Sequence, residues 1–219
     1  MADDYFQLFL STATQVKEET IQECENRINT WVNLREKWRN HYNDEIPLLL
    51  KEKRNELLMA VRFTECYQTI SWIEFLALSV GYYIAIRELR SILEAIIQAY
   101  YIDMKYPKIS IEGKLAILKE FLDVGRRESF GRALINRANP PNNHNIQALY
   151  GQLCEFVHPS LEQVTRILES PDSDRRIVEL MAPIFDKQLF EQCCHYSEEV
   201  ISHVIKINDN FVRAIQPLI

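Results

Sequence analysis

The segment LCEFVHPS, residues 153–160, brings a thiol, a carboxylate and an imidazole close together in the chain, at Cys154, Glu155 and His158. Glu155 and His158 have E-x-x-H spacing, which places the two side chains on neighbouring positions of a helix surface. Such a pair can form half of a metal site or supply a general acid–base group. Pro159 disfavours helical geometry at His158, so we expect the helix to end there.

A metal site can be tested by counting the same spacing elsewhere. Di-iron helical bundles use two E-x-x-H pairs and two further glutamates. Here the pair occurs once, because no glutamate stands three residues before the other histidines, His41, His144, His195 and His203. His195, Glu199 and His203 lie along one side of the last expected helix, but the outer two are about 12 Å apart along its axis. We interpret them as a solvated edge, and we predict neither a metal nor a cofactor.

Nucleophilic catalysis and nucleotide binding have less support. Cys154 lies on the same helical face as His158, and a neighbouring histidine can activate a thiol. A separation of four residues on one helix does not by itself make a catalytic geometry, so the alternative is a small residue at an interface. The sequence contains no glycine-rich phosphate-binding motif.

The segment that leads to His158 has two different faces. Its apolar face is made of Leu149, Leu153, Phe156 and Val157. The opposite face carries small and polar residues, Gly151, Cys154, Glu155 and His158. His158 therefore lies off the apolar stripe of its own helix. Its face is either an exposed helix end or a surface that meets another helix or subunit, where Gly151 and Cys154 would permit a close approach.

A second candidate site lies on the helix expected over residues 81–105. The polar residues of this helix fall within an arc of about 100°, and they are Arg87, Arg90, Ser91, Glu94, Gln98 and Lys105. Arg90 precedes Glu94 by four residues, which is the weaker order for a helical ion pair, so support of the helix itself is a poor reason for the pair. Two interpretations stay open: a solvent-facing seam, or a polar site between helices.

Charge limits the classes of partner. The net charge of -6 argues against a protein that coats duplex DNA, although a local basic patch is compatible with it. Four arginines cluster before the loop at 138–145, namely Arg126, Arg127, Arg132 and Arg137. They form either a phosphate-contacting patch or a solvated face diluted by Asp123 and Glu128.

The elements that must position these residues are helical. Glycine is scarce, and apolar residues recur at three- and four-residue steps, which predicts an all-α fold, an antiparallel helical bundle. The expected helices cover about 5–44, 48–104 with a break near 67–71, 112–137, a short stretch ending at 158, and a last helix with its apolar stripe over 189–215. The expected loops are 43–47, 105–110, 138–145 and 170–174. We predict residues 1–46 as a helical appendage packed on the core and 47–219 as the bundle domain.

The compartment is predicted from the chain start, the apolar run and the cysteines. The acidic start lacks the positive region of a secretory signal. The apolar run at 70–86 is short for a membrane span and contains Glu74, so we expect a buried core helix. Five cysteines without a C-x-x-C pair favour neither a disulfide framework nor a zinc ribbon. We expect a cytoplasmic protein.

Two segments resemble HEPN-like families of all-helical proteins. Residues 81–102 resemble a helix with the pattern R-S-x-x-E, matched by Arg90, Ser91 and Glu94. Residues 150–160 resemble a second signature, matched by Tyr150, Leu153, His158, Pro159 and Ser160. The resemblance covers residues 70–165 in these two short patches.

The resemblance implies a HEPN-like core, here with an extra long N-terminal helix, that dimerises with His158 at the groove. Many such proteins are metal-independent ribonucleases of prokaryotic defence or toxin systems. The nuclease motif places an arginine shortly before the histidine, where this chain has Gly151, Gln152 and Leu153. Arg90 would have to replace that arginine in stabilising a phosphate, with His158 as general acid–base.

We therefore predict a homodimer whose groove either cleaves RNA or, as a degenerate relative, binds RNA or a protein. The expected catalytic residues are His158, Arg90, Glu94 and Glu155. The expected RNA-binding residues are Arg87, Arg126, Arg127 and Arg132. The alternative is a non-enzymatic structural or partner-binding bundle in which these residues form an interface network, and a metal-binding bundle is a less favoured second alternative. Neither a membrane nor duplex DNA is an expected partner.

Overall fold

The computed structural model describes residues 2–45, 52–53, 55–122, 131–156, 185–215 and 217. These residues form helices and no strands, which confirms the predicted all-α fold. The helices are α1 (Ala2–Glu23), α2 (Glu25–Ile28), α3 (Thr30–Asn40), the π-helical turn η1 (His41–Glu45), α5 (Leu58–Leu78), α6 (Tyr82–Lys105), α7 (Ile111–Leu122), α8 (Gly131–Ala138), α9 (Asn143–Glu155) and α12 (Lys187–Ile215).

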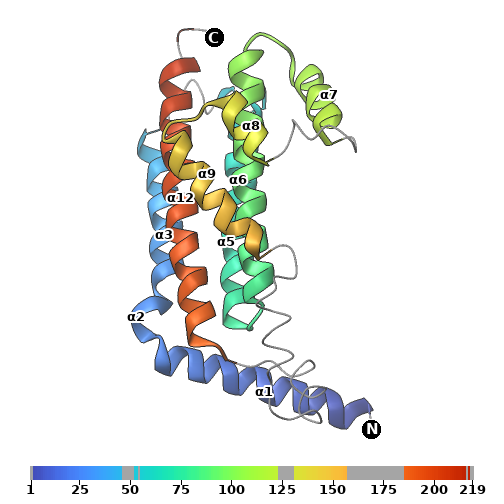
Figure 1. The fold of residues 1–219 in the computed structure, drawn as a ribbon, viewed down its shortest axis with the longest axis vertical. Coiled ribbons are helices and arrows are strands. Elements are labelled where there is room, and N and C mark those ends of the chain that lie inside the picture. Colours follow the sequence, from blue (N-terminus) through green and yellow to red (C-terminus); the bar gives the residue numbers. More distant parts are fainter. Residues whose placement is uncertain are drawn as a thin grey trace.

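The core lies between the long helices α3, α5, α6 and α12, which run along the same axis of the molecule (Figure 1). Each of these helices carries apolar side chains on the face that meets its neighbours. α6 is central, since it packs against both α5 and α12 and is covered in addition by α8 and α9. The predicted stripe of the last helix is confirmed, because α12 is one continuous helix whose stripe, from Leu189 to Ile215, is buried apart from a half-buried Tyr196.

The single helix predicted over residues 5–44 is wrong, because the chain breaks it between α1 and α3. Cys24 leaves helical geometry, with φ −126° and ψ 30°. As a result α1 crosses one end of the bundle while α3 runs along it (Figure 1). The apolar spacing continues across the break, so periodicity alone did not reveal it. α3 buries Trp31 and Trp38 in the common core, and the assignment of 1–46 to a helical appendage packed on the core stays a prediction.

The helix break predicted near residues 67–71 lies instead at 79–81. The Gly81 N–H donates to the Leu76 carbonyl at 2.7 Å, and Val80 takes a left-handed φ of 57°. This combination closes helix ends. The apolar run at 70–86 is therefore two helix ends and a turn, and its Glu74 forms an ion pair with Arg35 of α3. Among the described helices, none combines the length and apolar character needed to cross a bilayer.

The connections on either side of α7 and α8 agree in part with the prediction. Residues 106–110 join α6 to α7, and residues 139–142 join α8 to α9, so both predicted loops are present. The helix predicted over 112–137 is interrupted, because Gly131 begins α8 with a left-handed φ of 63°. Residues 123–130 and the predicted turn at 170–174 lie outside the described residues.

A buried ion pair joins α7 to the end of the α5–α6 hairpin. Lys114 Nζ lies 2.9 Å from Asp103 Oδ1, and the two side chains are 1% and 0% exposed. The other carboxylate oxygen of Asp103 accepts from the Met59 N–H at 2.8 Å, and Lys114 donates to the Glu56 carbonyl at 2.9 Å. Burial raises the pKa of Asp103, while Lys114 opposes this rise. The ion pair thus links α6 and α7 to each other and to the backbone at the start of α5.

Candidate functional site

A polar cluster joins α6 to α9, which lies across it (Figure 1). The Tyr150 hydroxyl donates to Glu94 Oε1 at 2.5 Å. Arg90 donates from Nε to the same hydroxyl and from Nη2 to the same carboxylate oxygen, each at 3.2 Å. The guanidinium carbon also lies 5.2 Å from the centre of the Tyr150 ring. Arg90 and Glu94 therefore occupy a polar site between helices, which we call the α6–α9 cluster.

Partial burial sets the charges of this cluster. The Arg90 and Glu94 side chains are 22% and 19% exposed. Burial raises the pKa of Tyr150, and its bond to Glu94 raises it further, so the phenol stays neutral. Burial by itself lowers the pKa of Arg90, but Glu94, Tyr150 and Cys154 together outweigh it and the net pKa is raised. A cation, an anion and a neutral hydroxyl thus satisfy one another, an arrangement that clamps two helices.

Two glycines allow α8 to approach this cluster closely. A Cβ placed on Gly131 would lie 3.2 Å from the Tyr150 hydroxyl oxygen. A Cβ on Gly151 would lie 2.6 Å from Arg132 Nη2, closer than real Cβ atoms come to other atoms. Gly151 thus permits a close approach, as the sequence suggests, and the group that approaches it is the Arg132 guanidinium of α8.

Two further cations on these helices remain uncommitted. Arg87 on α6 and Arg132 on α8 are both exposed. Within the part of the chain that the structure describes, neither side chain has a hydrogen-bond or ion-pair partner. Unlike Arg90, these two arginines keep their full charge available to an external anion.

A second polar junction lies at the far end of α6. The Tyr101 hydroxyl accepts from Lys105 Nζ and from Arg137 Nη2, each at 2.9 Å. Burial raises the pKa of Tyr101, but these two cations lower it to a net value below the ordinary one. Arg137, grouped in sequence with Arg132, is therefore engaged with α6.

No protein-family model, curated protein or solved structure matches the chain. A function is consequently inferred from the chain's own residues.

Several predicted site residues lie outside the described residues, namely Arg126, Arg127 and His158 with the following Pro159 and Ser160. α9 is described as far as Glu155, with Phe156 as its C-terminal cap. Phe156 packs against Tyr83 of α6 and Tyr196 of α12, with ring centres 5.9 and 5.8 Å apart. Glu155 is exposed. It has no hydrogen bond or ion pair within the described segments, so the structure joins Arg90 to Glu94 and Tyr150 but not to Glu155.

The histidines of α12 differ from one another. His195 and Glu199 form an exposed pair at 3.5 Å, as expected of a solvated edge. For His203 that expectation is wrong, because this side chain is only 8% exposed and its Nδ1 has no hydrogen-bond partner. Eight residues turn a helix by about 80°, which moves His203 from the edge onto the buried face. Burial lowers the pKa of His203, and Lys206 lowers it further. Within the described residues, no three potential metal ligands group together.

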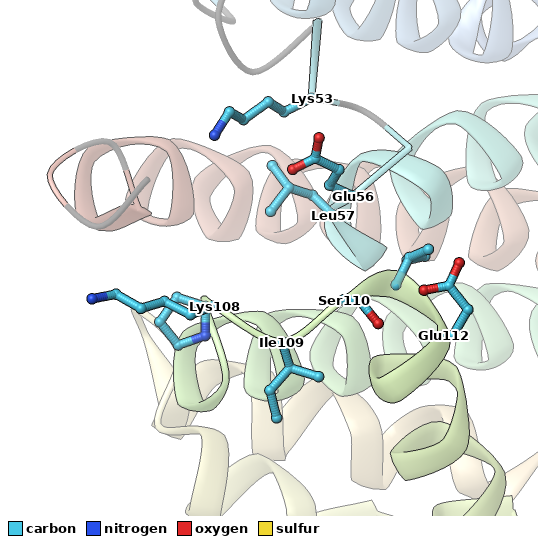
Figure 2. Close-up of a pocket in the computed structure, with 9 residues that line it drawn as sticks. Lys53, Glu56, Leu57, Lys108, Ile109, Ser110 and Glu112 are labelled. Atoms are coloured by element: carbon cyan, nitrogen blue, oxygen red, sulfur yellow. The ribbon is translucent and has the colours of Figure 1, made fainter.

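A separate pocket of about 610 Å³ lies between the start of α5 and the α6–α7 turn. Figure 2 shows Lys53 and Lys108 extending to one side of it, with Glu112 at the other end. None of the predicted site residues lines it. The pocket therefore belongs to a different part of the molecule from the α6–α9 cluster.

Tyr150 is the site residue to which the sequence assigned no role. Its only signal was its place in the signature at residues 150–160. Its position one turn before Cys154 did not show that its hydroxyl would meet α6. That contact depends on the path of α9 across α6, which is a tertiary property.

Proposed function

We propose that the chain is a HEPN-like helical-bundle protein that binds RNA through the face formed by α6, α8 and α9. The observation that carries this proposal is a pair of exposed arginines without a partner among the described residues: Arg87, three residues before Arg90 on α6, and Arg132, on α8 near Gly151. Cations without internal partners are the groups that neutralise phosphates. Because the net charge is -6, the binding must come from such a local patch.

Cleavage of the bound RNA is a further part of this proposal. His158 would serve as general acid–base and Arg90 would stabilise the charge that develops on the phosphate. Glu94 and Tyr150 hold the Arg90 guanidinium at two of its nitrogens, which would fix its orientation before the substrate binds. The resemblance to HEPN-like families is the sole support for a role in a prokaryotic defence or toxin system and for a cytoplasmic location.

The test is the binding of a fluorescein-labelled single-stranded RNA, followed by fluorescence anisotropy over a salt series. Each of Arg87→Ala and Arg132→Ala should weaken binding and lower the salt slope by about 0.7, the value for one lost phosphate contact on a single strand. Arg213→Ala serves as the matched control, because Arg213 is also exposed but lies near the end of α12.

The proposal fails if the wild type binds no RNA at low salt, or if Arg213→Ala weakens binding as much as Arg87→Ala does. Cleavage is measured on the same RNA by gel electrophoresis. His158→Ala should abolish it while leaving binding in place. Binding without cleavage by the wild type would identify the degenerate form.

A second candidate function, a partner-binding bundle, has its own observation. Trp72 and Phe75 on α5 are 52% and 56% exposed, and their rings stack at 5.2 Å with an angle of 18°. Large aromatic side chains on a surface are typical of protein interfaces, where tryptophan is enriched among the residues that dominate binding. For this second candidate we propose the face of α5 that carries Trp72 and Phe75 as the contact between two copies of the chain, which is a different contact from the dimer groove at His158 that the resemblance implies.

A further inference from the structure

Gly151 is the described glycine at which an added Cβ would come closest to a polar side-chain group, the Arg132 guanidinium. A Cβ at position 151 would lie 2.6 Å from Arg132 Nη2 and 3.7 Å from its Cζ. Gly151 lies inside α9, where glycine is less favourable than alanine. The helix itself therefore gives no reason for a glycine at this position, whereas the guanidinium contact does.

This contact lies beside the α6–α9 cluster. Gly151 follows Tyr150, whose hydroxyl bonds to both Arg90 and Glu94. Gly131, which precedes Arg132, approaches the same hydroxyl to 3.2 Å when a Cβ is added. The Arg132 and Arg90 side chains therefore lie near adjacent positions of α9, the first near Gly151 and the second bonded to Tyr150.

The two arginines differ in the charge that they offer to a ligand. Glu94 neutralises Arg90 at 3.2 Å. Arg132 has no such partner among the described residues, and it is exposed. A guanidinium group has five N–H donors, so contact of Nη2 with α9 leaves other donors free. A guanidinium group is suited to bind a phosphate through two parallel hydrogen bonds.

We propose that Gly151 positions a phosphate-binding arginine, Arg132. Because it has no side chain, Gly151 lets the Arg132 guanidinium rest against α9 and present its remaining donors to a phosphate of the RNA backbone. This inference rests on the proposed RNA function and adds a positioning residue, Gly151, that does not itself touch the ligand. The resulting site is for a phosphate group and is independent of base identity.

The experiment compares Gly151→Ala, Arg132→Ala and the double variant in the RNA-binding assay. Arg132→Ala should weaken binding about tenfold, because it removes one charged hydrogen-bonded contact. Gly151→Ala should weaken binding by less, because the added methyl displaces the guanidinium at the end of an exposed side chain without removing its charge. The double variant should bind no more weakly than Arg132→Ala alone, because both changes affect the same contact. Gln152→Ala is the matched control, as Gln152 is the exposed neighbour on α9.

A second readout separates this inference from the proposed function. The Nε–Hε resonance of Arg132 in an NMR spectrum should shift when inorganic phosphate is added to the wild type, and should shift less in Gly151→Ala. Melting temperatures verify the fold. If Gly151→Ala alone fails to fold, the double variant, in which the added methyl meets no guanidinium, provides the comparison with Arg132→Ala.

The outcomes are distinct. If Gly151→Ala binds RNA with wild-type affinity, the positioning role of Gly151 is wrong. Weaker binding by Arg87→Ala in the same assay would still support the proposed RNA binding. If phosphate shifts the Arg132 resonance but the protein binds no RNA, Arg132 beside Gly151 is a phosphate site and the proposed RNA binding is wrong. If the wild type responds to neither RNA nor phosphate, both proposals are wrong.

Discussion

The Tyr150 hydroxyl of α9 forms hydrogen bonds with two side chains of α6. It donates to Glu94 at 2.5 Å and accepts from Arg90 at 3.2 Å. Because the group is buried, removal of the hydroxyl leaves both partners with an unmade bond, and an unmade buried bond costs more than a formed one contributes. The polar part of the contact between α6 and α9 thus depends on this hydroxyl.

Tyr150→Phe should destabilise the protein by about 1–2 kcal/mol at pH 8, in urea unfolding. Burial and Glu94 raise the pKa of Tyr150 in the folded state. The contribution of this group is therefore complete below the unfolded tyrosine pKa of about 10 and is lost as pH rises towards the folded value. Above pH 10 the advantage of the wild type should shrink by about 1.4 kcal/mol per pH unit.

Tyr67→Phe is the control, because the Tyr67 hydroxyl has no hydrogen bond within the described residues. A wild-type advantage that stayed constant from pH 8 to pH 11 would show that the Tyr150 phenol ionises equally easily in both states.

At the residue scale, the sequence predicted which side chains share one side of a helix better than it predicted which of them are buried. The helical projection placed Arg90 and Glu94 on one stripe, and they do form an ion pair. The same projection placed His203 on a solvated edge, yet it is buried. A projection orders residues around one helix, but the width of the buried arc depends on how many helices surround it. α12 is covered by α3, α5, α6 and α9, so its edge is narrow.

At the scale of elements, α7 is attached to the bundle by a buried ion pair rather than by a wide apolar contact. It projects beside the bundle in Figure 1, and its Leu115 is 50% exposed. The buried pair of Lys114 and Asp103 joins it to α6 at 2.9 Å. An ion pair in the interior is costly to break from one side, because the remaining charge keeps no partner.

Lys114→Met should therefore destabilise the protein by about 3–5 kcal/mol. Adding Asp103→Asn removes the unpaired carboxylate and leaves an oxygen that can accept the Met59 N–H, so the double variant should recover part of the loss. Urea unfolding measures both, and Lys119→Met, an exposed position on the same helix, is the control. If the double variant were less stable than the single one, the carboxylate would not be the source of the cost.

Element boundaries were predicted less well than element type. The loops after α6 and α8 contain prolines and asparagines, and they were predicted. The turn at 79–81 lies inside an apolar run and was missed although it contains Gly81, because the left-handed φ falls on Val80, a residue that rarely adopts it. The break at Cys24 lies at a residue that carries no turn signal of its own.

At the scale of the whole molecule, the outer face of α5 is distinguished by large exposed aromatic side chains. The stacked Trp72–Phe75 pair lies there, half exposed. The opposite side of α5 contributes Phe63, Ile70 and Ile73 to the core. A helix with apolar groups on both sides is typical of a helix that is buried twice, once by its own chain and once by a partner.

The proposed dimer through this face predicts that Trp72→Ala raises the dimer dissociation constant about thirtyfold or more, which corresponds to a hot-spot loss of about 2 kcal/mol. Sedimentation velocity over a concentration series measures this change. Val61→Ala is the control, since Val61 is 45% exposed on the same helix but lies near its start. A wild type that is monomeric throughout the series would exclude a dimer through this face.

The packing of α3 against α12 also determines the order in which the chain can fold. Arg27 bonds to Glu198 and Asn208 lies 3.0 Å from His41, contacts that join residues 171 and 167 positions apart. The α5–α6 hairpin needs only local contacts, so it can form early, whereas closure of so long a loop is slow. During synthesis α3 emerges well before α12. Trp31, whose ring lies 5.6 Å from that of Phe190 on α12, therefore lacks this partner until the last helix has been made, whereas Trp38 can already pack against Phe63 of α5.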